Sequence, residues 1–129
     1  MGLDYLHGTG HGVGYFEGVH EGPVGLSKYN NTIYEANMIV TNEPGYYESG
    51  KYGIRIENML VVVKKDGISG FENLTLCPYD KNLLDNSLLT VNDVKFINEY
   101  HQRVWDVVSP HLQDDQESLS WLKEATSPI

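Results

Sequence analysis

The uneven distribution of glycine is the feature that most constrains how this chain can fold. Eleven of the 13 glycines lie in the first 53 residues, and every second residue from position 8 to position 14 is glycine. A glycine inside a helix costs roughly 1 kcal/mol relative to alanine, so the run disfavours a helix. We therefore predict loops and extended chain over residues 7–25, with glycines that let other backbone or a substrate approach closely.

The residue pattern after this run first predicts strands. Residues 38–41 form a short predicted strand that Pro44 stops, and residues 53–63 alternate as a longer one. Both faces of the longer strand become apolar after Asn58, which predicts a central position in a sheet. Residues 71–78 are expected to return as its antiparallel partner after a turn.

The residue pattern of the last 40 residues predicts helices. Thr90, followed three residues later by Asp93, is typical of an N-cap, and Pro110 is expected to end or kink the helix that begins there. Asp114 or Asp115 is predicted to cap a second, shorter helix. The order of strands and then helices predicts a single α+β domain over residues 1–129, β-rich over 1–80 and helical over 81–129.

Charge and apolar patterning exclude several classes of partner. Nine Lys plus Arg against 18 Asp plus Glu give a net charge of −9, the wrong sign for nucleic acid or anionic lipid. The longest apolar run, residues 59–63, is far shorter than the roughly 20 residues of a membrane span. The single Cys77 fits a reducing compartment, and no leader precedes Asp4. We expect a cytoplasmic protein that binds neither nucleic acid nor membrane.

Three of the five histidines lie within 14 residues of one another. His7 and His11 are separated by glycines that rule out a helical metal-binding pair, and His20 stands between turn residues. They either converge on a site or are incidental to a flexible glycine loop. His101 and His111 fall in the helical part, where we expect surface or core positions.

Glu43 and Glu57 are the carboxylates of interest. Glu43 is predicted at the end of a strand, and Glu57 lies inside an otherwise apolar one, where a carboxylate is costly unless it is paired or bound to a metal. An ion pair between Glu57 and Arg55, on the same strand face, is the alternative; Arg55 is also placed to support a metal ligand. Together with His11, the two glutamates would suit a hydrolytic divalent metal such as manganese, cobalt or zinc.

Four motifs in order and the tail of the chain form a recognisable set: residues 6–14, 19–23, 41–47, 53–58 and 121–129. Together they closely resemble the C-terminal part of Xaa-Pro aminopeptidase (aminopeptidase P) of the eukaryotic cytosolic type. The resemblance implies the C-terminal portion of a pita-bread fold and a two-metal centre, usually with Mn²⁺. It implies hydrolysis of the N-terminal residue from peptides with proline in second position, and it leaves open a homodimer of the full-length protein.

The same resemblance assigns roles to individual residues. It implies that His11, Glu43 and Glu57 bind metal, with Zn²⁺ or Co²⁺ as alternatives to Mn²⁺, and that Glu43 also handles the proton of the attacking water. His7 and His20 would line the substrate pocket and take part in catalysis. Such roles agree with the chemistry of metal-activated water and general acid–base catalysis.

The chain departs from the family pattern in one respect. Two further ligands of the family, aspartates upstream of His7, have no counterpart here, so three of five ligands and a carboxylate charge of −2 rather than −4 remain. We therefore expect an incomplete metal centre that is inactive by itself. The alternatives are a non-catalytic pita-bread module that binds partner proteins, and another pita-bread hydrolase such as prolidase.

Overall fold

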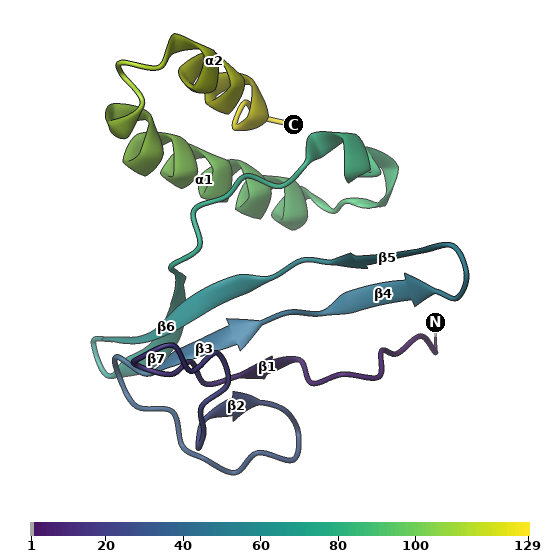
Figure 1. The fold of residues 1–129 in the computed structure, drawn as a ribbon, viewed down its shortest axis with the longest axis vertical. Helices are drawn as coiled ribbons and strands as arrows, with labels where there is room; N and C mark the ends of the chain where they lie inside the picture. The colour runs from purple at the N-terminus through teal and green to yellow at the C-terminus, as the bar shows by residue number, and fades with distance from the viewer. Residues whose placement is uncertain (1) are drawn as a thin grey trace. The chain divides into compact units, whose positions relative to one another are not determined.

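The chain forms two compact units that divide between Thr75 and Leu76 in the computed structural model, which describes residues 2–129 (Figure 1). The strands lie in the first unit and end at Asn73, and the first helical turn of the second unit begins at Lys81. Within the described residues, no helix is both long enough and apolar enough to cross a bilayer. Strands followed by helices confirm the predicted α+β class.

Seven strands lie in the described part of the first unit, and all four of their pairings are antiparallel. They form three sheets, in which β1 pairs with β2, β6 lies between β3 and β7, and β4 pairs with β5. The strands are β1 (Gly10–His11), β2 (Gly25–Leu26), β3 (Ile39–Asn42), β4 (Gly45–Glu48), β5 (Tyr52–Arg55), β6 (Asn58–Lys65) and β7 (Ile68–Asn73).

The strand β6 is the central strand of its sheet, as its apolar run predicts. It lies between β3 and β7, and Val62 on β6 and Val40 on β3 are almost fully buried. Asp66 and Gly67 join β6 to β7 with φ of 53° and 81°. Two consecutive residues with positive φ are what a tight type I′ hairpin turn requires, which explains why β7 begins at Ile68, before the start that the sequence predicts.

The prediction of one continuous strand over residues 53–63 is wrong, because the chain leaves the ladder at Ile56 and Glu57. β5 ends at Arg55 and β6 begins at Asn58. Across the gap, Pro44 separates β3 from β4 and has no N–H to donate, while its carbonyl accepts the Ile56 N–H at 3.2 Å. The β4–β5 hairpin, which lies between β3 and β6 in the chain, therefore extends the β3–β6 pair, with a break between the two pairs (Figure 1).

Two α-helices and three short 3₁₀ turns form the second unit. The helices are α1 (Val91–Val108) and α2 (Gln116–Ala125); the turns are η1 (Lys81–Leu83), η2 (Asn86–Leu88) and η3 (Ser109–His111). Thr90 and Asp93 form a full capping box at the start of α1, Pro110 lies in η3 where α1 ends, and Asp115 caps α2. These features confirm the sequence prediction of both helix starts.

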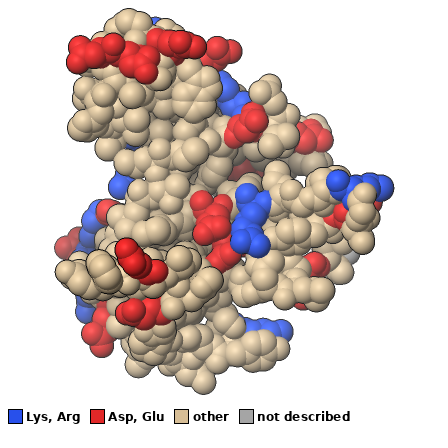
Figure 2. All heavy atoms as spheres, viewed as in Figure 1, with Lys and Arg blue, Asp and Glu red and all other residues tan. Residues whose placement is uncertain are grey.

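The helices meet around a small core of their own. Tyr100 and Val104 of α1 and Leu122 of α2 are buried together, and partly buried apolar side chains pack around them. Acidic side chains gather over α2 and the turn before it on the face of this unit that Figure 2 shows. That stretch contains Asp114, Asp115 and Glu117.

Candidate metal and substrate site

The glycine run brings β1 directly against the backbone of β3. A Cβ atom added to Gly10 would lie 1.8 Å from the Thr41 carbonyl oxygen, which no side chain can tolerate. The Glu43 N–H donates to the Thr9 carbonyl at 2.7 Å beside this contact. The prediction that these glycines permit close approach is confirmed, and in this part of the run the approaching group is backbone. The consequence is that His11 lies beside Thr41 and Glu43.

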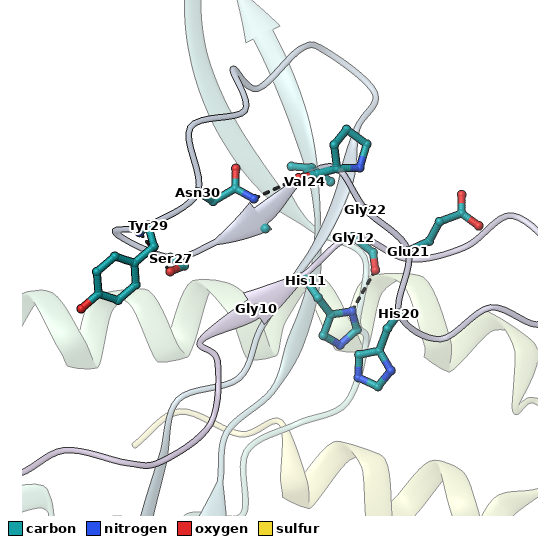
Figure 3. A pocket seen from close by; sticks show the side chains of 12 residues that line it. Gly10, His11, Gly12, His20, Glu21, Gly22, Val24, Ser27, Tyr29 and Asn30 are labelled. Carbon is teal, nitrogen blue, oxygen red and sulfur yellow. Dashed lines mark hydrogen bonds between the residues drawn. The ribbon is translucent and has the colours of Figure 1, made fainter.

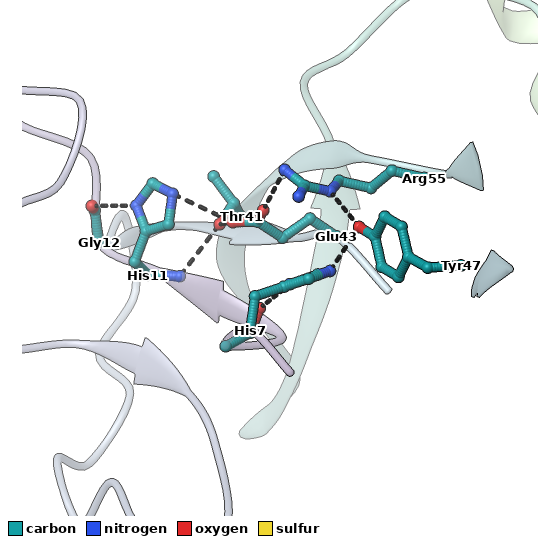
Figure 4. Close-up of polar contacts among 8 residues, drawn as sticks. His7, His11, Gly12, Thr41, Glu43, Tyr47 and Arg55 are labelled. Carbon is teal, nitrogen blue, oxygen red and sulfur yellow. Dashed lines mark hydrogen bonds and ion pairs between the residues drawn. The ribbon is translucent and has the colours of Figure 1, made fainter. Parts of the chain in front are cut away.

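His11 and Glu43 form the centre of the candidate site (Figure 4). Nε2 of His11 lies 3.1 Å from Oε1 of Glu43, and Glu43 is only 8% exposed. Thr41 joins them: its hydroxyl donates to the same carboxylate oxygen at 3.0 Å and accepts the backbone N–H of His11 at 3.0 Å. A buried carboxylate held in this way has a defined position relative to the imidazole.

The orientation of the His11 ring is that of a metal ligand. Its Nδ1 lies 2.8 Å from the Gly12 carbonyl oxygen, which can only accept, so Nδ1 carries a proton. Nε2 faces the Glu43 carboxylate, where it can donate an N–H to Oε1 or offer its lone pair to a bound cation. Metal-binding histidines characteristically donate the other ring N–H to a carbonyl or carboxylate, which holds the ring in position. The residues present therefore fit a cation held by His11 and Glu43.

Arg55 and Tyr47 extend this site toward His7. Arg55 Nη1 donates to Oε2 of Glu43 at 3.2 Å, and its Nε donates to the Tyr47 hydroxyl at 3.1 Å. That hydroxyl lies 2.6 Å from Nε2 of His7, whose Nδ1 faces the Gly8 carbonyl at 2.8 Å. The Tyr47 hydroxyl therefore donates to His7. The hydrogen bond to Tyr47, with smaller contributions from the charges of Tyr47, Glu43 and Glu57, outweighs the effect of burial and raises the pKa of Arg55 above its ordinary value.

Tyr47 is a site residue that the sequence reasoning missed. Tyr47 pairs with Gly53 across the β4–β5 ladder, and a Cβ at Gly53 would lie 2.6 Å from the Tyr47 ring. The ring thus lies over a position without a side chain and can extend toward Arg55. A tyrosine opposite a glycine, close to the predicted Glu43, is the pattern that would have pointed to it.

His20 stands next to His11 at the edge of an open hollow of about 470 Å³ (Figure 3). The two imidazole rings have centroids 4.1 Å apart and are tilted by 51°. The hollow is also lined by Val24, Tyr29 and Asn30, from the chain around β2. The structure thus brings His20 beside His11, whereas His7 lies near Glu43 through Tyr47 and Arg55.

Glu57 is not where the sequence reasoning expects it. It is exposed and lies in the link between β5 and β6, not inside a strand. Arg55 pairs with Glu43, and the ion pairs of the described residues include none between Arg55 and Glu57. Among residues 2–129, no three His, Cys, Asp or Glu side chains lie close enough to hold a metal ion. The structure therefore shows a fit for two donors, and the third predicted ligand stands apart.

Comparisons with known proteins cover almost the whole chain. A family model described as metallopeptidase family M24 matches residues 1–64, and a model of the C-terminal region of the same peptidase matches residues 67–129. The chain belongs to metallopeptidase family M24. Its helical second unit thus lies within the C-terminal region of this family, and the candidate site lies within the part matched by the main peptidase model.

Individual M24 relatives agree with this assignment. The chain is 54% identical to a probable Xaa-Pro aminopeptidase P of Coprinopsis cinerea and 52% identical to one of Laccaria bicolor, covering 99% of this chain and 22% of each relative. The crystal structure of an X-prolyl aminopeptidase from Caenorhabditis elegans matches with a TM-score of 0.90 and 42% identity over 99% of this chain and 22% of that one. That protein is described as a cytosolic enzyme with a di-nuclear active site. The chain therefore has the fold of the C-terminal part of this enzyme, and it spans about a fifth of the length of its relatives.

Proposed function

We propose that this chain supplies part of the active site of an Xaa-Pro aminopeptidase, which hydrolyses the N-terminal residue from peptides with proline in second position. The observation that carries the proposal is the His11–Glu43 pair at 3.1 Å, with the His11 ring anchored through Nδ1 and its Nε2 directed at a buried carboxylate. Relatives named Xaa-Pro aminopeptidase P support the substrate class.

His11 and Glu43 would bind divalent metal, with Glu57 as a further ligand in the complete centre. Mn²⁺ is the proposed metal, and Zn²⁺ and Co²⁺ are alternatives. Bound divalent ions lower the pKa of water and stabilise negative charge that develops on the scissile carbonyl. A single imidazole and two carboxylates are too few donors for two ions, so the rest of the centre must come from polypeptide beyond these residues.

The site residues also have roles other than metal binding: they transfer a proton, hold the Glu43 carboxylate in position or contact the peptide. Glu43 accepts hydrogen bonds from Thr41 and Arg55, and we propose that its carboxylate takes the proton of the attacking water and passes it to the leaving proline nitrogen. Arg55 holds that carboxylate in position. His7, through Nε2 and Tyr47, and His20, beside His11, would contact the peptide. We also propose a cytosolic location and a homodimer for the full-length enzyme.

A chimeric enzyme tests this proposal. The segment of the Coprinopsis cinerea relative that aligns with this chain is replaced by the chain, and hydrolysis of an Xaa-Pro-Xaa peptide and of an Xaa-Pro dipeptide is measured with Mn²⁺. We expect cleavage of the tripeptide and a loss of at least 100-fold in kcat for Glu43→Gln, since general acid–base groups contribute about 10²–10⁴-fold. Glu48→Gln, the same change in β4, serves as the matched control.

Each outcome bears on a different part of the proposal. A folded chimera that cleaves neither substrate would favour a binding module, and one that cleaves only the dipeptide would favour a prolidase. Full activity of Glu43→Gln would remove Glu43 from the chemistry. Metal analysis of the 129-residue chain by itself is expected to find fewer than two bound ions; two tightly held ions would contradict the incomplete donor set.

A further inference from the structure

A short segment of the second unit is held on α1 by two neighbouring side chains. This segment, residues 76–81, is named the strap; it begins where the second unit begins. The Tyr79 N–H donates to Nε2 of His101 at 3.0 Å, and the Tyr100 hydroxyl donates to the Cys77 carbonyl at 2.9 Å. His101 is completely buried. This histidine lies on α1, outside the candidate metal and substrate site.

The hydrogen bond fixes the protonation state of the His101 ring. Because Tyr79 donates to Nε2, that nitrogen bears a lone pair and Nδ1 carries the only ring proton. Nδ1 has no hydrogen-bond partner in the described part of the chain, so the ring is held through Nε2. A second proton would have to bind Nε2, where an N–H would then face the Tyr79 N–H. The protonated ring and the closed strap are mutually exclusive.

The surroundings of His101 also oppose a positive charge. The rings of Tyr79 on the strap and Tyr100 on α1 pack at 5.9 and 6.2 Å from the imidazole. Lys81, at the end of the strap, is the charged group that acts on the ring. Burial, and then the charge of Lys81, lowers the pKa of His101 below its ordinary value of 6.5.

The strap also secures the end of α2. Nζ of Lys81 donates to the Glu124 carbonyl at 2.6 Å and to the Ser127 carbonyl at 3.3 Å. A cation at this position adds charged hydrogen bonds to carbonyls at the C-terminal end of the helix, and it interacts favourably with the helix dipole. Detachment of the strap from α1 would therefore also loosen the C-terminal end of α2.

We propose that His101 is a pH-sensitive latch, which holds the strap on α1 while the ring is neutral and releases it when Nε2 takes up a proton. The direction of the pH effect follows from the difference in proton binding by His101 between the closed and the released states. Well above pH 6.5 the ring is neutral in both the closed and the released states, so pH has no effect on the latch. As the pH falls below 6.5, the released state binds the proton first, and the closed state loses stability until its own, lower pKa is reached.

Hydrogen–deuterium exchange tests the latch on the 129-residue chain and on the chimera, between pH 7.5 and 5. We expect protection of the peptide that covers the strap, corrected for intrinsic exchange, to fall by about 10-fold or more below pH 6.5, with a smaller fall at the C-terminal end of α2. In His101→Gln, whose side-chain oxygen can still accept from Tyr79 but does not titrate, protection should not change with pH. His111→Gln, which removes the exposed histidine of η3, should behave like the parent chain.

The titration of the imidazole ring itself keeps the proposal falsifiable if His101→Gln does not fold. The NMR signals of the His101 ring and of the Tyr79 amide are followed in the parent chain. We expect a single midpoint below pH 6.5 that is common to both signals. A ring that titrates at or above 6.5, a Tyr79 amide that does not respond, or the same pH dependence in folded His101→Gln would each overturn the latch. None of these outcomes depends on peptidase activity.

Discussion

The substitution Gly10→Ala tests directly how the glycine run creates the candidate site. An added Cβ atom would lie 1.8 Å from the Thr41 carbonyl oxygen and 2.8 Å from the carbonyl carbon, both backbone atoms. Real Cβ contacts are essentially never shorter than 3.0 Å, so β1 and β3 would have to separate by more than about 1 Å. The obstacle cannot rotate away as a flexible side chain would.

The expected cost follows from what lies around this contact. Inserting a carbon into a packed interior typically costs about 1–3 kcal/mol. Thr41 is 3% exposed, and hydrogen bonds from His11 N–H to Thr41 and from Glu43 N–H to Thr9, at 3.0 and 2.7 Å, lie on either side of the contact. Both must lengthen when the strands separate. We therefore expect about 3 kcal/mol, roughly a 100-fold shift in the opening equilibrium of this region.

Hydrogen–deuterium exchange of the β3 amides measures this cost, since both tryptophans lie in the other unit and would not report on it. Gly8→Ala is the matched control, because a Cβ at Gly8 meets nothing within 4 Å and neither glycine has a left-handed backbone. We expect Gly8→Ala to be neutral or to stabilise by about 0.4–1 kcal/mol through the unfolded state. Equal β3 protection in the two variants would refute the reasoning.

Three further predictions concern the helical unit. Thr90→Ala removes the side chain that accepts from the Asp93 N–H and should lower the free energy of unfolding by about 1 kcal/mol in urea titrations followed by tryptophan fluorescence. Val104→Ala, at a fully buried position, should cost about 2 kcal/mol in the same assay, whereas Val107→Ala, 43% exposed, should cost less than half of that. Hydrogen bonds from Ser118 lower the pKa of Asp115 below 3.8, so the stability from this cap is present above pH 3.8 and is lost as the pH falls below it. In Asp115→Asn, the loss of helix stability below pH 3.8, followed by circular dichroism, should be smaller.

Local interactions account for the features that the sequence predicts well. The N-cap of α1 depends on Thr90 and Asp93, three residues apart, and the cap of α2 depends on Asp115 and residues of the following turn. The apolar run after Asn58 places β6 at the centre of its sheet because a strand with two apolar faces must be covered on both. Such features need only neighbouring residues, so composition and spacing reveal them.

The details of the site depend on residues that are far apart in the chain. Alternation places Arg55 and Glu57 on one predicted strand face, yet the break opposite Pro44 puts Glu57 in an exposed link, and Arg55 reaches Glu43 instead. Tyr47 escaped the sequence reasoning because its role depends on the β4–β5 register that sets it opposite Gly53. The position of a residue along its own strand does not specify which residue of the neighbouring strand lies opposite to it.

By itself, then, the sequence determined the α+β class, the helix starts, the family motifs and the closeness of approach at the glycine run. Only the tertiary structure decided that His11 faces Glu43, that Arg55 supports Glu43, and that His101 is buried beneath the strap. The physical reason is range: capping and periodicity act within a turn or a strand, whereas ion pairs and buried hydrogen bonds depend on strand register and on which distant segments pack together.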